Sequence, residues 1–118
     1  MSGSGEELVD ARYSHHWRLP ELGRTGQERL LSARILIVGC GALGATLASL
    51  TARAGVGAIR IVDRDFVDLS NLQRQTLFDE DDVAQRLPKA EAARRKLASI
   101  NSGIVVEAIV ADDGPQNI

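Results

Sequence analysis

The chain has 118 residues, a formal net charge of −2 and 44% hydrophobic residues. This length fits one small domain, and the balanced charges argue against binding of nucleic acids through phosphate contacts. No apolar run is long enough to cross a membrane, and the polar, acidic N-terminus is unlike a secretory signal. Cys40 is the only cysteine, so the chain can form neither an internal disulfide nor a paired-cysteine metal site. We therefore expect a cytoplasmic protein that contacts neither DNA nor membranes and whose own residues hold no metal.

Residues 1–33 predict an N-terminal helical segment that is separate from the rest of the chain. A first helix is expected over residues 6–18, and Gly23 is expected to act as a stop in the turn that follows. A second, short helix is expected over residues 26–32, with two leucines as its buried residues, Leu30 and Leu31.

A strand over residues 34–38 runs into the glycine loop Gly39-x-Gly41-x-x-Gly44, and a helix is expected over residues 42–54. The glycines let the backbone turn sharply and approach a ligand closely. The helix aims its free N–H groups and the positive end of its dipole at anionic oxygens. We therefore predict that a nucleotide binds at this loop. The helix also carries one apolar face with helical spacing, made up of Leu43, Leu47, Leu50 and Ala54.

A second strand is expected over residues 58–62 and a third over residues 104–110, with a helix over residues 88–100 between them. A long polar loop over residues 63–78 precedes that helix, and such loops usually carry function. The order of the elements predicts a Rossmann-like α/β fold, in which a three-stranded parallel sheet is flanked by helices. This is the first half of a doubly wound fold, and we expect residues 34–118 to form it as a nucleotide-binding half-domain.

The segments after the second strand carry the residues that favour ATP over other nucleotides. Asp63 follows that strand and is placed to hold ribose hydroxyls. Arg74 can pair with phosphate oxygens through its planar guanidinium, and Asn71 can donate to a phosphate or accept from a hydroxyl. Lys89 lies at the start of a helix, where a cation opposes the dipole and therefore favours an anionic ligand nearby. A nicotinamide enzyme needs no such loop, so the pattern favours ATP.

The sequence also leaves open a simpler, structural interpretation of each of these residues. Asp63 could be a solvated turn residue, Arg74 could form a structural ion pair, and Lys89 could be an ordinary exposed lysine. Asp65 could serve equally well as a turn-forming residue. Cys40 has no evident base to activate it, so we expect a small buried core residue instead of a nucleophile.

Five short strings extend this pattern along the chain: Ile37-Val38-Gly39-x-Gly41-x-Leu43-Gly44, Ala54-Gly55-Val56-Gly57, Val62-Asp63-x-Asp65-x-Val67, Ser70-Asn71-Leu72-Gln73-Arg74-Gln75 and Pro88-Lys89. Together they closely resemble the adenylating enzymes that activate ubiquitin-like proteins. These are the ThiF/MoeB/HesA proteins of bacteria and the ubiquitin-activating enzymes of eukaryotes. The resemblance covers roughly residues 12–110, and the fourth string is its most specific part.

The resemblance implies that this chain is the ATP-binding N-terminal portion of an adenylyltransferase. In that family, ATP and Mg²⁺ are used to adenylate the C-terminal carboxylate of a ubiquitin-like or sulfur-carrier protein. The resemblance also implies a homodimer and places the Mg²⁺ ligand beyond Ile118. It assigns catalytic roles to Arg74 and Lys89. The nucleotide contacts that it implies are Gly39, Gly41, Ala42, Gly44, Asp63, Asp65, Ser70, Asn71, Leu72, Gln73, Arg74 and Lys89.

Two positions depart from the family pattern. Ala42 stands where the family often has a second glycine, and its methyl group could crowd the nucleotide. His15 stands where the family usually has an arginine that reaches into the neighbouring subunit's site, so it could contact phosphate only when protonated. The sequence leaves three alternative functions open: an NAD(P)-binding oxidoreductase domain, the non-catalytic half of a heterodimeric activating enzyme, and a relative that adenylates a small carboxylate on tRNA.

Overall fold

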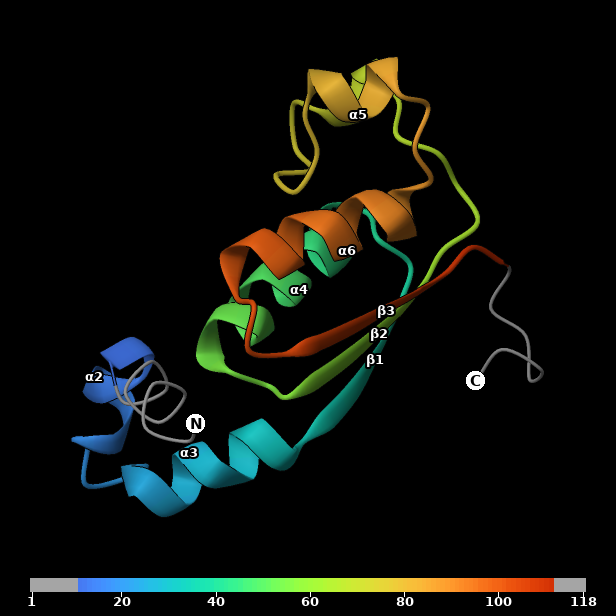
Figure 1. Ribbon diagram of the computed structural model, residues 1–118. Coiled ribbons are helices and arrows are strands. Elements are labelled where there is room, and N and C mark those ends of the chain that lie inside the picture. The colour runs from blue at the N-terminus through green and yellow to red at the C-terminus, as the bar shows by residue number, and fades with distance from the viewer. Residues whose placement is uncertain (1–10, 112–118) are drawn as a thin grey trace.

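The computed structural model describes residues 11–111, which form a parallel sheet with helices packed on one face (Figure 1). The strands are β1 (Arg34–Val38), β2 (Ala58–Val62) and β3 (Val105–Ile109), in the order β1-β2-β3. β1 and β2 have the predicted bounds, and β3 is one residue shorter than predicted at each end. All three strands run in the same direction, so their carboxyl ends meet at one edge of the sheet. The predicted three-stranded parallel α/β fold is confirmed.

Two helices, α4 (Ala42–Ala54) and α6 (Lys89–Ile100), cover the same face of the sheet. Consecutive right-handed crossovers place successive helices on one side, which explains this arrangement. No helix within residues 11–111 has the length and apolar character needed to cross a bilayer. The core between the helices and the sheet is built mainly from small and branched aliphatic side chains, among them Ile37, Ala45, Ala48, Ile59, Ile61, Ala93 and Leu97.

The leucine spacing of α4 does not mark the side that packs on the sheet. Three alanines of this helix are fully buried, whereas three leucines are 46–73% exposed: Ala45, Ala48 and Ala52 against Leu43, Leu47 and Leu50. α4 packs against both the sheet and α6, and small side chains let the helix axis approach its neighbours closely. The buried side of α4 is therefore the alanine side.

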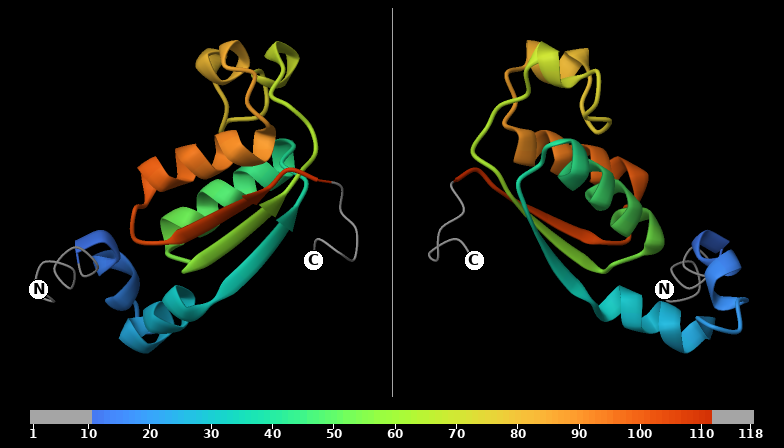
Figure 2. Two further views of the ribbon diagram at one scale, coloured as in Figure 1. Left: turned by 45° about the vertical axis from the view of Figure 1, so that its right-hand side comes forward. Right: turned by 180° about the vertical axis from the view of Figure 1, so that it is seen from behind.

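The opposite face of the sheet is covered by no helix within the described residues (Figure 2). Leu36 and Val105 are exposed on it. Arg60 and Glu107 face each other across β2 and β3, with 3.1 Å between the Arg60 guanidinium and a Glu107 carboxylate oxygen. In the part of the chain that is described, helices therefore flank the sheet on one side only.

The N-terminal helices differ from their predicted bounds. α2 (Ser14–Trp17) occupies only part of the helix expected over residues 6–18, of which residues 6–10 lie outside the described region. α3 (Gly23–Ser32) begins at the glycine that was expected to be a stop. Gly23 has φ +62°, a left-handed conformation that glycine adopts without strain, so it turns the chain into the helix. The buried residue of α3 is Gln27, while its two leucines are only partly covered.

A buried polar network ties these N-terminal helices to the rest of the structure. The fully buried Asn101 amide donates to the Tyr13 hydroxyl at 2.7 Å and to the Ala52 carbonyl at 2.8 Å. The Gln27 amide donates to the Ala54 carbonyl, and its oxygen lies 2.8 Å from His16 Nδ1. These contacts hold α2 and α3 against the C-terminal ends of α4 and α6. They therefore lie at the end of the sheet opposite the glycine loop (Figure 2).

The connection between β2 and α6 contains two short helices, η1 (Leu69–Asn71) and α5 (Glu80–Ala84). α6 begins at Lys89, with Pro88 as its N-cap in an extended conformation, one residue later than predicted. Phe66 pairs with Pro88 as an isolated antiparallel bridge, which closes the connection back onto the start of α6.

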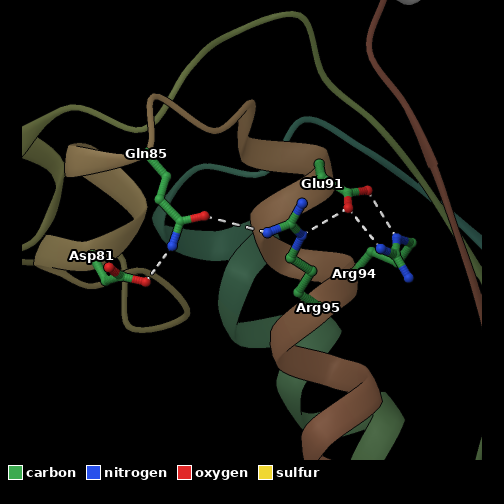
Figure 3. Close-up of polar contacts among 5 residues, drawn as sticks. All are labelled: Asp81, Gln85, Glu91, Arg94 and Arg95. Carbon is green, nitrogen blue, oxygen red and sulfur yellow. Dashed lines mark hydrogen bonds and ion pairs between the residues drawn. The ribbon is translucent and has the colours of Figure 1, made fainter.

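Figure 3 shows polar contacts among five residues where α5 meets α6. Glu91, in the first turn of α6, accepts from Arg94 at 2.6 Å and from Arg95 at 2.9 Å. Gln85 bridges the two helices, because its amide donates to Asp81 and its oxygen accepts from Arg95. The hydrogen bonds from Arg94, and then from Arg95, lower the pKa of Glu91 from 4.5 to about 2.

Replacing Glu91 with glutamine is expected to lower the free energy of unfolding at pH 7 by about 0.5–1 kcal/mol, the range for two partly exposed helical ion pairs. Because the pKa of Glu91 is depressed on folding, its contribution is fully present above about pH 4.5 and is lost as the pH falls toward about 2. Urea unfolding at several pH values measures this difference. Glu28→Gln, an exposed change on α3, should leave stability unchanged. A difference between wild type and Glu91→Gln that did not shrink in acid would contradict the assignment.

Candidate nucleotide-binding site

The glycine loop follows the carboxyl end of β1. The absence of a side chain has a different physical consequence at each of its three glycines. Gly39 has φ +87°, which side chains rarely tolerate. A side chain at Gly44 would collide with the Gly39 carbonyl oxygen, so the first turn of α4 packs directly on the loop. Gly41 is the N-cap of α4, and a methyl group there would meet no protein atom within 4 Å. The backbone at Gly41 is therefore open to close approach by a ligand.

The N-terminus of α4 presents free backbone donors at this open position. The first bond of the helix runs from the Ala45 amide to the Gly41 carbonyl at 2.8 Å. The amides of Ala42, Leu43 and Gly44 have no acceptor within residues 11–111, and no side chain caps this end. The first turn contains no acidic residue. Unsatisfied amides at the positive end of a helix dipole favour phosphate oxygens.

Asp63 fastens the loop to the end of β2. The Cys40 amide donates to Asp63 Oδ2 at 2.6 Å, and the Asp65 amide donates to Oδ1 at 2.7 Å. The Gly39 amide adds a bond to the Val62 carbonyl at 2.8 Å. Asp63 is only 9% exposed, so the alternative interpretation of this residue as a solvated turn residue is wrong. Its carboxylate orders the loop, and each oxygen keeps a lone pair that can accept from a ligand.

Asp63 and Asp65 line an open cavity of about 370 Å³ at the carboxyl edge of the sheet. This is the edge where parallel α/β sheets place their ligands. The other residues that line it are Val38, Gly39, Val62, Arg64 and Ala111.

Lys89 is the first residue of α6 and is only 8% exposed, so it is not an ordinary surface lysine. Its amide donates to the Asp65 carbonyl at 2.8 Å, which joins the start of α6 to the segment beside the cavity. Within residues 11–111 its ammonium group makes no hydrogen bond or ion pair. A buried cation without a counter-ion is costly, and its position at a helix N-terminus adds to that cost. An anionic ligand would remove both penalties.

The pKa of the Cys40 thiol is changed by burial and by two charged side chains. Burial, followed by the charge of Asp63, raises the pKa of its thiol to about 12, while the charge of Lys89 acts in the opposite direction. The side chain is fully buried. The thiol therefore stays protonated at neutral pH, and the prediction that Cys40 is a buried core residue is confirmed.

The segment over residues 70–75 forms a turn around Asn71. The Asn71 side-chain oxygen accepts from the Asp68 amide at 2.9 Å, and its carbonyl accepts from the amides of Arg74 and Gln75. The Arg74 side chain is exposed, and its guanidinium donates to the Ser70 carbonyl at 3.4 Å. In the same segment Gln73 is exposed and Leu72 packs partly against the core.

The structure thus brings some of the predicted site residues together and leaves others apart. Gly39, Asp63 and Asp65 line the cavity at the carboxyl edge of the sheet, and the backbone amide of Lys89 joins the start of α6 to Asp65 at this edge. Arg74 and Lys89 are not among the residues that line the cavity, so their contacts with phosphate stay predictions. His15 is exposed on α2, at the far end of the sheet.

Sequence reasoning missed two contributors to this edge. The Cys40 amide, not its thiol, connects the loop to Asp63. Ala111 lines the cavity because the Asp63 amide bonds to the Ile109 carbonyl at 3.1 Å and brings the end of β3 beside β2. The parallel order of the strands was a signal for Ala111, since strand ends in such a sheet lie side by side. No group of three or more His, Cys, Asp or Glu side chains within residues 11–111 is placed to hold a metal ion.

A glycine loop after β1, a helix N-terminus and an acidic residue at the tip of β2 are features of the doubly wound class of α/β domains, which bind ligands at this edge of the sheet. The chain belongs to the ThiF family, whose sequence model matches residues 13–118.

Two curated relatives carry names that describe an activity. The sulfur carrier protein ThiS adenylyltransferase of Bacillus subtilis is 50% identical over 110 residues, which is 93% of this chain and 33% of that protein. The adenylyltransferase and sulfurtransferase MOCS3 of Mus musculus is 47% identical over 101 residues, which is 86% of this chain and 21% of that protein. The chain therefore spans a third or less of the length of these relatives.

Two solved structures share the fold. The tRNA N6-threonylcarbamoyladenosine dehydratase TcdA of E. coli, in complex with AMP, matches with a TM-score of 0.82 and 31% identity. That match covers 92% of this chain and 42% of TcdA. E. coli MccB with ATP matches with a TM-score of 0.75 and 36% identity, over 86% of this chain and 31% of MccB.

Proposed function

We propose that this chain supplies the ATP-binding part of an enzyme that adenylates the C-terminal carboxylate of a ubiquitin-like sulfur-carrier protein. The observation that carries the proposal is the buried Lys89, which makes no ion pair within residues 11–111 and begins a helix at the same edge of the sheet as Asp63 and the start of α4. Membership in the ThiF family and the printed names of the relatives support the choice of reaction. We also propose a cytoplasmic, homodimeric enzyme, with residues 1–33 as a helical segment before the half-domain.

In the proposed reaction, a carboxylate oxygen of the carrier protein attacks the α-phosphorus of ATP. The bond from that phosphorus to the bridging oxygen breaks, so the products are an acyl-adenylate and pyrophosphate. The amides of Ala42, Leu43 and Gly44 and the ammonium of Lys89 offset the negative charge that develops on the phosphate oxygens. Asp63 accepts hydrogen bonds from the ribose hydroxyls. Arg74 and Asn71 would add phosphate contacts from the segment over residues 70–75.

The free amides at the start of α4 and the buried Lys89, whose ammonium group makes no ion pair within residues 11–111, support an anionic nucleotide as the ligand. Bound Mg²⁺ would shield the phosphates of ATP during the attack. We assign none of the residues 11–111 as its ligand and expect a carboxylate beyond Ile118 to hold it.

Isothermal titration with ATP–Mg²⁺ and with NAD tests the nucleotide. We expect a measurable dissociation constant for ATP and at least about tenfold weaker binding of NAD, since Lys89 favours a concentrated phosphate charge. Tight binding of NAD with none for ATP would overturn the proposal in favour of an oxidoreductase domain.

A second candidate is adenylation of a small carboxylate on tRNA, favoured by the fold match to E. coli TcdA in complex with AMP. The two candidates share the ATP site and differ in the acceptor. Isotope exchange between ATP and pyrophosphate separates them, because the proposed reaction predicts stimulation by a sulfur-carrier protein and the alternative predicts stimulation by modified tRNA.

A further inference from the structure

The cavity at the carboxyl edge of the sheet is lined by an arginine to which the proposed reaction gives no role. Arg64 comes directly after Asp63 and lines the cavity with it. Its side chain is 71% exposed, and its Nε lies 3.8 Å from an Asp65 carboxylate oxygen. An ion pair that is this long and this exposed contributes little to the stability of a fold. The pair with Asp65 is therefore not a sufficient reason for an arginine at this position.

The strand order gives the direction in which a nucleotide would lie across this edge. The carboxyl ends of β1, β2 and β3 lie side by side in that order. The free amides of α4 follow β1, Asp63 follows β2, and Ala111 follows β3. In the proposed function the phosphates bind at α4 and the ribose binds at Asp63. Because the base and the phosphates of a nucleotide are attached to opposite ends of the ribose, the base would then lie on the β3 side of Asp63.

The residues around that position suit the flat, apolar face of a base. Val62 and Ala111 line the cavity with aliphatic side chains. Arg64 is the only cation among the described residues that line it. A guanidinium is planar, and its hydrogen bonds and ion pairs run in that plane, so its faces stay available for stacking on an aromatic ring. A base in this part of the cavity would therefore meet a planar cation next to aliphatic side chains.

We propose that the Arg64 guanidinium stacks on the base of the bound nucleotide and selects purines over pyrimidines. The two fused rings of a purine cover a guanidinium more completely than the single ring of a pyrimidine, so the stacked area and the attraction are larger. The inference rests on the proposed function, because a base reaches Arg64 only as part of a nucleotide. It adds a specificity residue to a site whose other side chains are proposed to contact the ribose and the phosphates.

Titration calorimetry of the full chain with ATP–Mg²⁺ and with UTP–Mg²⁺ tests this role, because the two nucleotides differ only in the base. Arg64→Ala should weaken ATP binding by about 3- to 30-fold, the range for a cation stacked on an aromatic ring. UTP binding should weaken less, so the preference of the wild type for ATP should shrink. Arg29→Ala, which removes an exposed arginine of α3 at the opposite end of the sheet, should leave both affinities within about twofold. An equal loss for ATP and UTP, or no loss for either, would contradict stacking on the base.

Two further replacements separate stacking from charge. Arg64→Tyr keeps a planar side chain without the charge and should bind ATP within about threefold of the wild type. Arg64→Lys keeps the charge without the plane and should bind ATP about as weakly as Arg64→Ala. The reverse order, with the lysine variant binding like wild type and the tyrosine variant binding weakly, would make Arg64 a counter-charge to Asp65 or to the phosphates and would overturn the proposal.

The same titrations distinguish failure of this inference from failure of the proposed function. A wild-type chain that bound neither nucleotide would overturn both. A wild-type chain that bound ATP, together with an Arg64→Ala variant of equal affinity, would overturn the role of Arg64 and leave the ATP site in place. Because the Arg64 side chain is exposed, all three variants should retain the circular dichroism spectrum of the wild type.

Discussion

Replacing Lys89 with methionine is expected to weaken ATP binding by about 10- to 150-fold while leaving the free energy of unfolding unchanged or raised. A hydrogen bond to a charged group contributes about 1.5–3 kcal/mol, which corresponds to that range of affinity. Stability should not fall, because the Lys89 ammonium has no partner within residues 11–111 and is only 8% exposed. Removing a buried charge without a counter-ion removes a desolvation cost. Titration calorimetry and urea unfolding measure the two quantities.

The matched control for this change is Lys96→Met on the same helix. Lys96 is partly exposed and pairs with Asp79 at 3.5 Å, so its replacement removes one cation of α6 without touching the site. ATP affinity should stay within about twofold of wild type, since screened surface charges contribute little. If Lys89→Met destabilised the fold and bound ATP normally, Lys89 would be a structural lysine and the proposed site would lose its central cation.

Arg74→Ala is a second variant of the site, and its effect is measured on the reaction. The Arg74 side chain is exposed, and its only hydrogen bond within residues 11–111 goes to the nearby Ser70 carbonyl, so the fold should be retained. We expect ATP–pyrophosphate exchange, stimulated by the carrier protein, to fall by about 10²- to 10³-fold, the range for loss of one donor at a developing oxyanion. Arg53→Ala, which removes an exposed arginine bonded to Ser49, serves as the control. Unchanged exchange in Arg74→Ala would remove Arg74 from the catalytic assignment.

Asp63→Asn is expected to lower the free energy of unfolding by about 2 kcal/mol and to weaken ATP binding at the same time. The carboxylate accepts from the amides of Cys40 and Asp65 on its two oxygens. An asparagine of the same shape offers only one oxygen, so its NH₂ group would face one of these N–H donors. A buried donor left without a partner costs about 1–3 kcal/mol. Urea unfolding followed by circular dichroism measures the loss of stability.

Asp65→Asn provides the comparison for Asp63→Asn. The Asp65 side chain is exposed and lies 3.8 Å from Arg64, so its replacement should change stability by less than about 0.5 kcal/mol. Nucleotide titration then separates the two roles of Asp63. A destabilised Asp63→Asn protein that bound ATP with wild-type affinity would make Asp63 a structural residue only. A protein of unchanged stability would contradict the bonds that fasten the glycine loop to β2.

Local patterns were sufficient for the order and bounds of the main elements. Residues 34–38 and 58–62 are short β-favouring runs bounded by glycine or polar residues, and both are strands with these bounds. Residues 42–54 lie between two glycine segments, and α4 has these bounds, with Gly55 closing it in the left-handed region. These elements could be predicted because strand propensity, helix periodicity and glycine backbone freedom act over a few residues.

The N-terminal helices show where such patterns stop being informative. Gly23 was expected to be a stop because glycine disfavours helix interiors, yet its positive φ starts α3. The buried residue of α3 is Gln27, because its amide satisfies the Ala54 carbonyl at the end of α4. A polar residue becomes a core residue only when a partner from another part of the chain satisfies it.

The sequence by itself determined the strand, glycine loop and helix of the site, because the conformations involved are set by neighbouring residues. Only the tertiary structure decided which side of α4 is buried, since that depends on how closely α6 and the sheet approach it. It also decided that Asp63 holds the loop through the Cys40 amide, and that Lys89 is buried with its amide bonded to the Asp65 carbonyl and its ammonium group in no ion pair within residues 11–111. These properties arise from residues more than 20 positions apart, and the desolvation and hydrogen bonding that create them exist only in the folded chain.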